Sequence, residues 1–290
     1  MSSGGRKGND VFNPGENPGG SMKEGWKGAS TNVLADDFGL TIPTEIVPLP
    51  SQGVIYNSDD SLSMLETVEI RAMTAREEDI LTNRAFIKNK SVIVELIKSC
   101  LINKNIDPNN MIAGDRNAIM VALRITGYGQ EYNVEVDCPS CRERSKQEFD
   151  LSKLPIRNLH QSPVALGSNV FEFELPLTKK KVRFKYLTGH EEKEIAIIEE
   201  RMKKRGFQAS NTVTTRFKYQ VLSIANISDK SKVQKFCQNM PARDSLALRK
   251  FMDKNEPGIE MKQHMNCPHC FEESEVRLPM GANFFWPDSE

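Results

Sequence analysis

The chain has 290 residues, enough for one large domain or two ordinary ones, and 38% of them are hydrophobic. Its 39 basic and 39 acidic residues cancel to a formal net charge of zero, which gives no global electrostatic case for binding nucleic acid or a membrane surface. No apolar run approaches the roughly 18 residues of a membrane span, and Met1-Ser-Ser-Gly-Gly lacks the apolar core of a signal peptide. We therefore expect a chain kept in a reducing cytoplasm, where paired cysteines suggest metal rather than disulfide.

Residues 1–45 are predicted to form a flexible, glycine-rich N-terminal arm. Eight of the 18 glycines lie within the first 28 residues, mixed with Ser, Asn and Pro. Such a segment cannot bury enough apolar surface to offset the entropy lost on ordering. Two interpretations stay open: a disordered tail, or an arm that becomes ordered only against a partner.

From residue 46 the pattern indicates strands followed by helices. Residues 49–53 look like a turn that enters a strand at 54–56, and residues 68–72 alternate as a half-buried strand. Thr74 and Glu77 predict a capping box, in which hydroxyl and carboxylate satisfy each other's backbone donors at a helix start. Helices are expected at about 75–86, 90–103 and 115–125, then strands at 132–136 and 149–151.

The most informative feature is that the chain repeats itself. The segment 111–115 (MIAGD) is followed by Cys138-Pro-Ser-Cys141, and 129 residues later 240–244 (MPARD) is followed by Cys267-Pro-His-Cys270. One constant offset relates both pairs of motifs. A duplicated unit that carries one Cys-Pro-x-Cys per copy implies two half-sites that can meet around one metal ion.

The second copy repeats the predicted elements of the first. Strands at 170–175 and 182–186 flank a hairpin turn at 179–181, and Thr188 with Glu191 forms a second capping box, 114 residues after the first. Further helices are expected near 211–225, 230–238 and 242–253. The predicted fold class is α+β, with two tandem related repeats of strands, helices and strand-knuckle-strand. The predicted domains are the arm at 1–45, repeat 1 at 46–160, repeat 2 at 161–280, and an aromatic C-terminal tail at 281–290.

The four paired cysteines predict one structural zinc site shared by the repeats. A Cys-x-x-Cys turn between strands supplies two of the four tetrahedral ligands that zinc needs, so Cys138, Cys141, Cys267 and Cys270 complete the set. The 125 residues between the pairs mean that the metal ties the repeats together. Alternatives are a redox disulfide within each pair or a metal site that has been lost. One departure is the residue after each pair, where many knuckles have glycine and this chain has Arg142 and Phe271.

Motifs of enzymes are missing from the sequence. There is no glycine-rich phosphate loop and no Gly-x-Ser-x-Gly turn, and a zinc ion with four protein ligands leaves no open position for chemistry. His264 and His269 are interpreted as solvent-facing neighbours of the second pair. The basic runs at 179–181 and 203–205 are interpreted as a turn and a helix end, although a few lysines on a zinc ribbon can also contact phosphates.

The C-terminal segment contains three consecutive aromatic residues, Phe284, Phe285 and Trp286, which cannot alternate onto one core face. Either they fold back onto the domain, or they dock on a partner as an anchor. We predict them as partner-binding residues.

Three motifs together suggest a family. Leu49-Pro-Ser-x-Gly53, then Arg71-Ala-Met-Thr-x-Arg-Glu77-Glu78, then Cys138-Pro-x-Cys141 with Phe149-Asp-Leu151, follow one another in an order that resembles the base plate protein family of T-even-like contractile-tailed phages. The resemblance covers roughly residues 46–280. It implies a role in building the baseplate hub, as a virion part or as an assembly factor, and brings no catalytic residues. This chain differs in its glycine-rich arm and in its complete second half.

The sequence thus predicts a non-enzymatic, zinc-stabilised structural or assembly protein of a phage tail baseplate. Its partners would be other baseplate and tail proteins, and several copies could lie in a symmetric assembly. It would be located in the host cytoplasm during assembly, and in the virion tail baseplate if it is a permanent subunit. The alternative is a cytoplasmic zinc-ribbon protein that binds nucleic acid, which the zero net charge disfavours.

Overall fold

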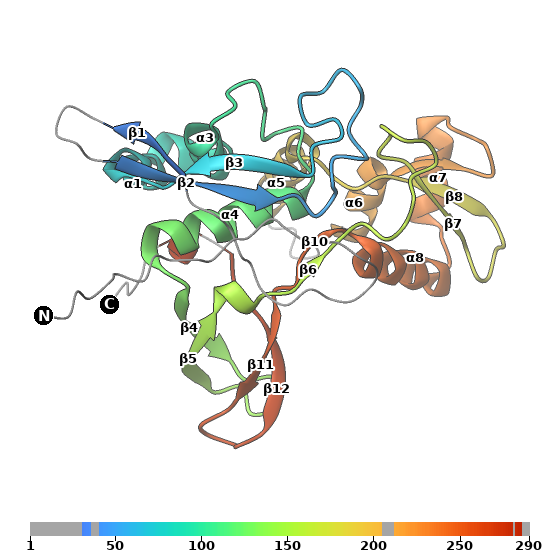
Figure 1. Ribbon diagram of the computed structural model, residues 1–290. Helices are drawn as coiled ribbons and strands as arrows, with labels where there is room; N and C mark the ends of the chain where they lie inside the picture. The colour runs from blue at the N-terminus through green and yellow to red at the C-terminus, as the bar shows by residue number, and fades with distance from the viewer. Residues whose placement is uncertain (1–30, 36–40, 205–211, 281, 286–290) are drawn as a thin grey trace, which may run out of the picture.

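The computed structural model describes residues 31–35, 41–204, 212–280 and 282–285. Over these residues the fold is mixed α+β with small antiparallel sheets, which confirms the predicted class. Figure 1 shows two helix-and-sheet bodies side by side and a lobe of four strands that projects from beneath them. No helix in the described ranges is both long and apolar enough to cross a membrane.

The first body contains a three-stranded sheet in the order β1-β2-β3 with four helices. Its elements are β1 (Thr31–Ala35), β2 (Thr41–Pro48), β3 (Thr67–Arg71), α1 (Ala75–Thr82), α2 (Arg84–Lys88), α3 (Val92–Cys100) and α4 (Ala113–Tyr128). The arm boundary predicted at residue 45 falls inside β2, which pairs with β3 from Thr44 to Pro48 and with β1 on its other edge. Residues 1–30 lie outside the described part of the chain.

The strand predicted at 54–56 is absent from the described fold, and the segment forms turns instead. Ile55 and Tyr56 are buried at 2% and 6% exposure, so their apolar character reflects the core rather than a sheet. The turns are held by Asp115 of α4, whose carboxylate accepts hydrogen bonds from the Ser51 backbone (2.9 Å), the Ser51 hydroxyl (2.6 Å) and the Tyr56 hydroxyl (2.5 Å).

The second body has a sheet in the order β7-β8-β9 and four further helices. Its elements are β7 (Phe171–Glu174), β8 (Lys181–Phe184), β9 (Val221–Ile224), α5 (Gly189–Lys204), α6 (Thr212–Gln220), α7 (Lys230–Gln238) and α8 (Ala242–Asn255). The helix predicted near 211–225 was too long: it ends at Gln220, and β9 follows at once. β9 is apolar and partly β-branched, and it pairs with β8 through Val182 and Ile224.

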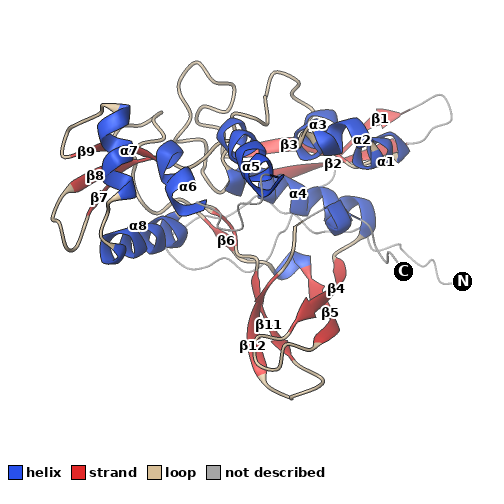
Figure 2. Ribbon diagram, turned by 180° about the vertical axis from the view of Figure 1, so that it is seen from behind, coloured by secondary structure: helices blue, strands red, loops and turns tan. Residues whose placement is uncertain are grey.

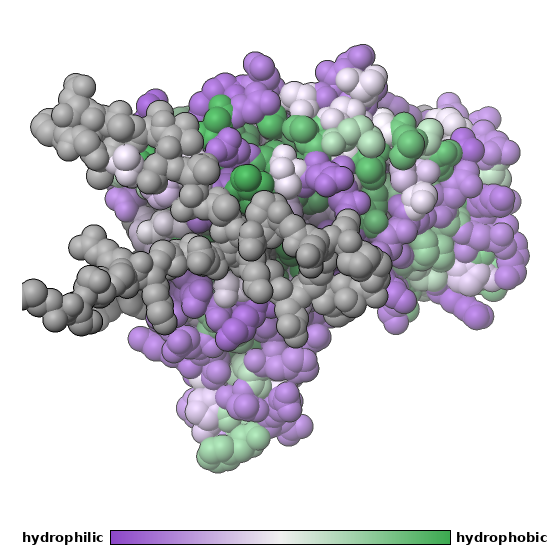
Figure 3. Space-filling model, viewed as in Figure 1, coloured by the Kyte–Doolittle hydropathy of each residue, from purple (hydrophilic) through white to green (hydrophobic). Residues whose placement is uncertain are grey.

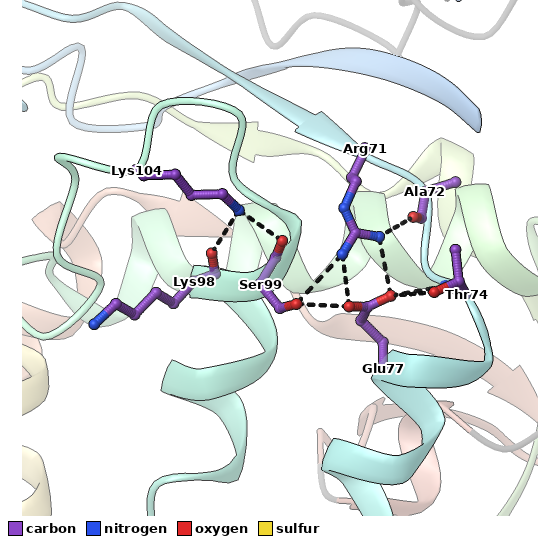
Figure 4. A network of polar contacts seen from close by, with 7 residues as sticks. All are labelled: Arg71, Ala72, Thr74, Glu77, Lys98, Ser99 and Lys104. Carbon is purple, nitrogen blue, oxygen red and sulfur yellow. Dashed lines mark hydrogen bonds and ion pairs between the residues drawn. The ribbon is translucent and has the colours of Figure 1, made fainter. Parts of the chain in front are cut away.

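The first capping box belongs to a larger charged network (Figure 4). The Arg71 guanidinium donates to both oxygens of Glu77 at 2.9 and 2.6 Å, and the Ser99 hydroxyl donates to the same carboxylate at 2.6 Å. The backbone N–H and the hydroxyl of Thr74 also donate to this carboxylate, at 2.9 and 2.7 Å. β3, α1 and α3 are thereby joined through one buried carboxylate. Lys104 closes the end of α3 by donating to the carbonyls of Lys98 and Ser99.

The second capping box repeats this arrangement. The Glu191 carboxylate accepts from the backbone N–H of Thr188 at 2.8 Å and from its hydroxyl, and it is paired with Lys185. Lys185 precedes Glu191 by six residues, as Arg71 precedes Glu77. Burial alone would raise the pKa of each glutamate, but the hydrogen bonds and the cation outweigh it and lower the pKa of both to about 2.

We expect Glu77 to contribute stability that disappears in acid. Because its folded pKa of about 2 lies below the ordinary value of 4.5, the contribution is complete above about pH 5 and is lost as the pH falls towards 2. Allowing for solvent near the partly exposed Arg71, it is on the order of 2 kcal/mol. The free energies of unfolding of the parent and of Glu77→Gln should therefore differ most near neutral pH and converge near pH 2. A difference that does not change with pH would contradict this assignment.

The two bodies meet along α4. A Cβ atom added to Gly114 would lie 1.8 Å from the carbonyl oxygen of Pro257, so only glycine allows this backbone contact. Arg116 is paired with Glu192 at the start of α5, and Ile112 forms a β-bridge with Thr188. A short pair, β6 (Ile156–Arg157) with β10 (Gly258–Ile259), connects the halves a second time.

The projecting lobe consists of two antiparallel hairpins, one from each half (Figure 2). The first is β4 (Glu131–Asp137) with β5 (Arg144–Asp150), and the second is β11 (Lys262–Asn266) with β12 (Glu273–Arg277). Each strand alternates buried and exposed residues, and the buried set points into the space between the hairpins: Tyr132, Val136, Ser145, Phe149, Met265 and Val276. The pairing of the two predicted knuckles is thus built into the packing of the strands that carry them.

The base of the lobe is fixed by Arg124 of α4. Its fully buried guanidinium donates to three carbonyl oxygens, those of Gly129 (2.8 Å), Glu131 (3.0 Å) and Phe284 (3.1 Å). These carbonyls belong to the end of α4, the start of β4 and the C-terminal 3₁₀ helix η2 (Ala282–Phe285). A second 3₁₀ helix, η1 (Leu151–Lys153), follows β5.

Candidate metal centre

The two cysteine pairs form the same turn at the tips of the two hairpins. In the first, the N–H of Arg142 donates to the carbonyl of Cys138 at 2.9 Å and the N–H of Cys138 donates to the carbonyl of Glu143 at 3.0 Å. In the second, the N–H of Phe271 donates to the carbonyl of Cys267 at 2.9 Å, and the N–H of Cys267 donates to the carbonyl of Glu272 at 3.1 Å. Each turn brings two thiols to the same side of its hairpin.

The residue after each pair adopts the left-handed conformation that glycine supplies in many such turns. Arg142 has a φ of 65° and Phe271 has a φ of 59°. The absence of glycine therefore leaves the turn geometry intact, at a cost of about 1 kcal/mol for each non-glycine residue. This cost is tolerated because the four hydrogen bonds of the two turns fix the backbone on both sides.

The sulfur atoms of all four cysteines lie within 4.8 Å of one another. Two of the sulfur contacts join one half to the other: Cys138 to Cys270 at 3.8 Å and Cys141 to Cys267 at 3.6 Å. Four sulfurs placed about 2.3 Å from a central zinc ion would be separated by about 3.8 Å, the edge of the tetrahedron. A disulfide would require about 2.05 Å. The spacing fits a tetrahedral ion between four thiolates.

The electrostatics of the cluster also fit a cation. Backbone amides at Cys141 and Ser140 donate to the sulfur of Cys138 and, against the effect of burial, hold the pKa of that thiol at about 6. The backbone amide of Glu143 acts in the same way on Cys141, but burial and the neighbouring sulfurs raise the pKa of Cys141 to about 12. Four thiolates at this spacing repel one another, so the fully ionised set needs a positive charge at its centre.

The donor set is entirely sulfur, which is typical of structural zinc sites. Cys138 and Cys267 are each 1% exposed, Cys141 is half-buried and Cys270 is exposed. The cluster therefore lies near the tip of the lobe. The first cysteine of each pair is buried inside the lobe, and the second lies closer to solvent. All four positions of a tetrahedral ion would be taken by protein, which leaves no position for a substrate.

Other candidate ligands lie away from the cluster. His264 and His269 are both exposed, and His264 faces Glu273 across its hairpin at 3.4 Å. Cys100 and Cys237 are buried within α3 and α7. Among the described residues, the group of four cysteines is the only one of this kind that could hold a metal ion.

The aromatic tail lies partly in the core. Phe284 and Phe285 are both 0% exposed, and Phe284 packs edge-to-face against Tyr132 of the first hairpin with ring centroids 5.1 Å apart. Of the two interpretations, folding back onto the domain accounts for both rings, which are removed from the surface that a partner could contact. Trp286 lies outside the described residues. The residues that sequence reasoning missed are Arg124 and Asp115. Asp115 binds Ser51 and Tyr56, and Arg124 binds Phe284, so their roles depend at least in part on residues that are distant in the chain.

Comparison with known proteins gives a family match within the first part of the chain. The family model of the T4 bacteriophage base plate protein matches residues 46–167. This segment runs from β2 to beyond the first hairpin, so it includes Cys138 and Cys141 and excludes Cys267 and Cys270. No curated protein and no solved structure matches the chain.

Proposed function

We propose that this chain is a non-enzymatic structural or assembly protein of the phage tail baseplate, acting in its hub region with other tail proteins as partners. The support is the match of residues 46–167 to the T4 bacteriophage base plate protein family. The observation that carries the mechanism is the cluster of four sulfurs, two from each half. Cys138, Cys141, Cys267 and Cys270 would hold zinc, which would supply four bonds between the hairpins.

We further propose that the halves at 46–160 and 161–280 descend from one duplicated unit. Three pairs of features support this. The capping carboxylates Glu77 and Glu191 each pair with a cation six residues earlier. A buried aspartate near the start of α4 and of α8, Asp115 and Asp244, accepts backbone hydrogen bonds from a turn of its own half. Each half also ends in a cysteine hairpin. The arm at 1–45 and the tail at 281–290 would then be extensions of the duplicated core.

The proposed role is to present surfaces in a fixed relative orientation. The junction along α4 and the shared lobe join the two halves at separate places (Figure 1). A rotation of one half about either contact would therefore break the second one. A rigid two-body piece of this kind suits a symmetric assembly in which every copy must place its neighbours identically. It also needs no bound substrate and no moving part.

Mass spectrometry of purified phage particles tests the location of the protein. We expect the chain at a fixed number of copies per particle if it is a permanent subunit, and in tail intermediates from infected host cytoplasm if it is an assembly factor. Co-purification with tail proteins from infected cells covers both cases. Absence from particles and from tail intermediates, together with a salt-dependent mobility shift on nucleic acid, would contradict the proposal and favour a zinc-ribbon nucleic-acid-binding protein.

A further inference from the structure

The tip of the lobe exposes a large apolar side chain in a strained position. Phe271 is 86% exposed, the largest fraction among the exposed large apolar side chains of the described residues. Its φ of 59° costs free energy that glycine would avoid. The corresponding residue of the first knuckle is Arg142, which has the same backbone conformation and an ordinary surface side chain. Neither the fold nor the metal cluster requires a phenyl ring at this position.

The charges beside this ring are partly acidic. Glu272 follows it directly and is exposed, and Glu273 comes next, facing His264 at 3.4 Å. Arg142 and Glu143 lie in the other turn of the tip and offset each other. Figure 3 shows hydrophobic surface at the end of the lobe, bordered by hydrophilic side chains. The second knuckle thus presents an apolar knob with acidic residues at its base.

A hollow of complementary character lies between the two halves, among α2, α3 and α5. It has a volume of about 400 Å³, and Phe86 and Ile197 contribute apolar lining. Lys88 and Lys193 supply two positive charges, and Glu95 supplies one negative charge. Neither lysine has an ion-pair partner within the described parts of the chain. The hollow is therefore an apolar recess with unpaired basic groups at its edge.

We propose that Phe271 of one copy inserts into the hollow lined by Phe86 and Ile197 on a second copy of this chain. Figures 1 and 2 place the tip of the lobe at the far end of the molecule from α3 and α5, and Figure 2 shows the same for α2, so a single chain cannot make the contact with itself. Glu272 would meet Lys88 and Lys193 at the edge of the hollow. The contact is head-to-tail, and repetition would give a ring or an open chain, according to the rotation between copies.

The test uses the purified full-length protein with zinc bound and compares two glycine variants by sedimentation equilibrium. Phe271→Gly and Arg142→Gly relieve the same backbone strain in corresponding turns, but only the first removes the knob. We expect the parent chain and Arg142→Gly to self-associate, and the dissociation constant of Phe271→Gly to rise about tenfold or more, as for a central aromatic anchor. Equal zinc content in all three proteins shows that the knuckle has formed. A parent chain that remains monomeric overturns the proposal, and so does equal self-association of the two variants.

Charge exchange and cross-linking then locate the contact. Glu272→Lys alone and Lys193→Glu alone should each weaken self-association. An equimolar mixture of the two variants should regain part of it, because the unchanged tip of one meets the unchanged hollow of the other and the basic tip meets the acidic hollow. A photoreactive phenylalanine at position 271 should cross-link to peptides that contain residues 84–95 or 193–197. Cross-links confined to other segments, or to added tail proteins alone, would show that the ring serves a different surface. None of these readouts depends on the assignment to a phage baseplate.

Discussion

Cys138→Ser and Cys267→Ser should each abolish binding of the same single zinc ion, although 128 residues separate the two positions and they lie in different halves. Each change leaves three sulfurs in a cluster whose members lie within 4.8 Å, which is too few for a closed tetrahedral site. Because structural zinc contributes on the order of 10 kcal/mol to folded metal-dependent domains, a chelator should lower the melting temperature of the parent chain markedly. Metal analysis of the purified proteins, followed by thermal unfolding with and without chelator, gives both results.

The control is Cys237→Ser, which alters a buried thiol of α7 outside the cluster. This variant should lose some stability and retain one equivalent of zinc. Two equivalents in the parent chain, or one equivalent remaining after Cys267→Ser, would contradict a shared site. A parent chain without zinc that carries a disulfide within each pair under reducing purification would favour the redox alternative.

Asp115→Ala is expected to cause a large loss of stability, about 3 kcal/mol or more. Asp115 is 0% exposed, and the substitution leaves the N–H of Ser51 and the hydroxyl of Tyr56 without an acceptor in the core. Burial raises the pKa of Asp115 despite the lowering effect of these donors, so the hydrogen bonds offset only part of the cost of placing a carboxylate here. Urea unfolding at neutral pH measures the loss.

The matched control for Asp115→Ala is Asp244→Ala. Asp244 accepts from the backbone N–H groups of Leu177 (2.7 Å) and Thr178 (3.0 Å), in a turn where the Leu177 side chain is 52% exposed. Asp244 is itself 0% exposed, like Asp115, but it holds a turn that borders solvent. Water that enters from this side can replace the lost acceptor, so we expect a smaller loss of about 1 kcal/mol. If Asp244→Ala costs as much as Asp115→Ala, the difference between a buried turn and an exposed turn does not explain the size of the effect.

The features that sequence predicted well are those set by local chemistry. The capping boxes at Thr74 and Thr188 depend on residues three positions apart, and the hairpin turns at the cysteines depend on spacing within six residues. The proximity of the two cysteine pairs was also predicted, because zinc needs four ligands and each pair provides two. Local patterns combined with one coordination rule therefore located the candidate site.

The features that sequence reasoning missed depend on distant partners. The sequence of β9 is compatible with the end of a helix, and its pairing with β8 makes it a strand. The apolar residues at 54–56 have the pattern of a strand, but hydrogen bonds to Asp115 hold this segment in turns. Phe284 and Phe285 look like an exposed anchor because their neighbours, the first hairpin and Arg124, lie about 150 residues earlier. In each case tertiary packing overrode the local pattern.

Because sulfur contacts join Cys138 to Cys270 and Cys141 to Cys267, an ion bound by all four cysteines would be retained only by a molecule whose two hairpins are both present and correctly paired. A polypeptide that stops before residue 267 carries one pair of ligands and loses its metal to any competing chelator. Contacts between residues this far apart in the chain form late in folding. A bound ion would then be a mark of a complete chain, because unfinished or misfolded copies would lack the stabilised lobe.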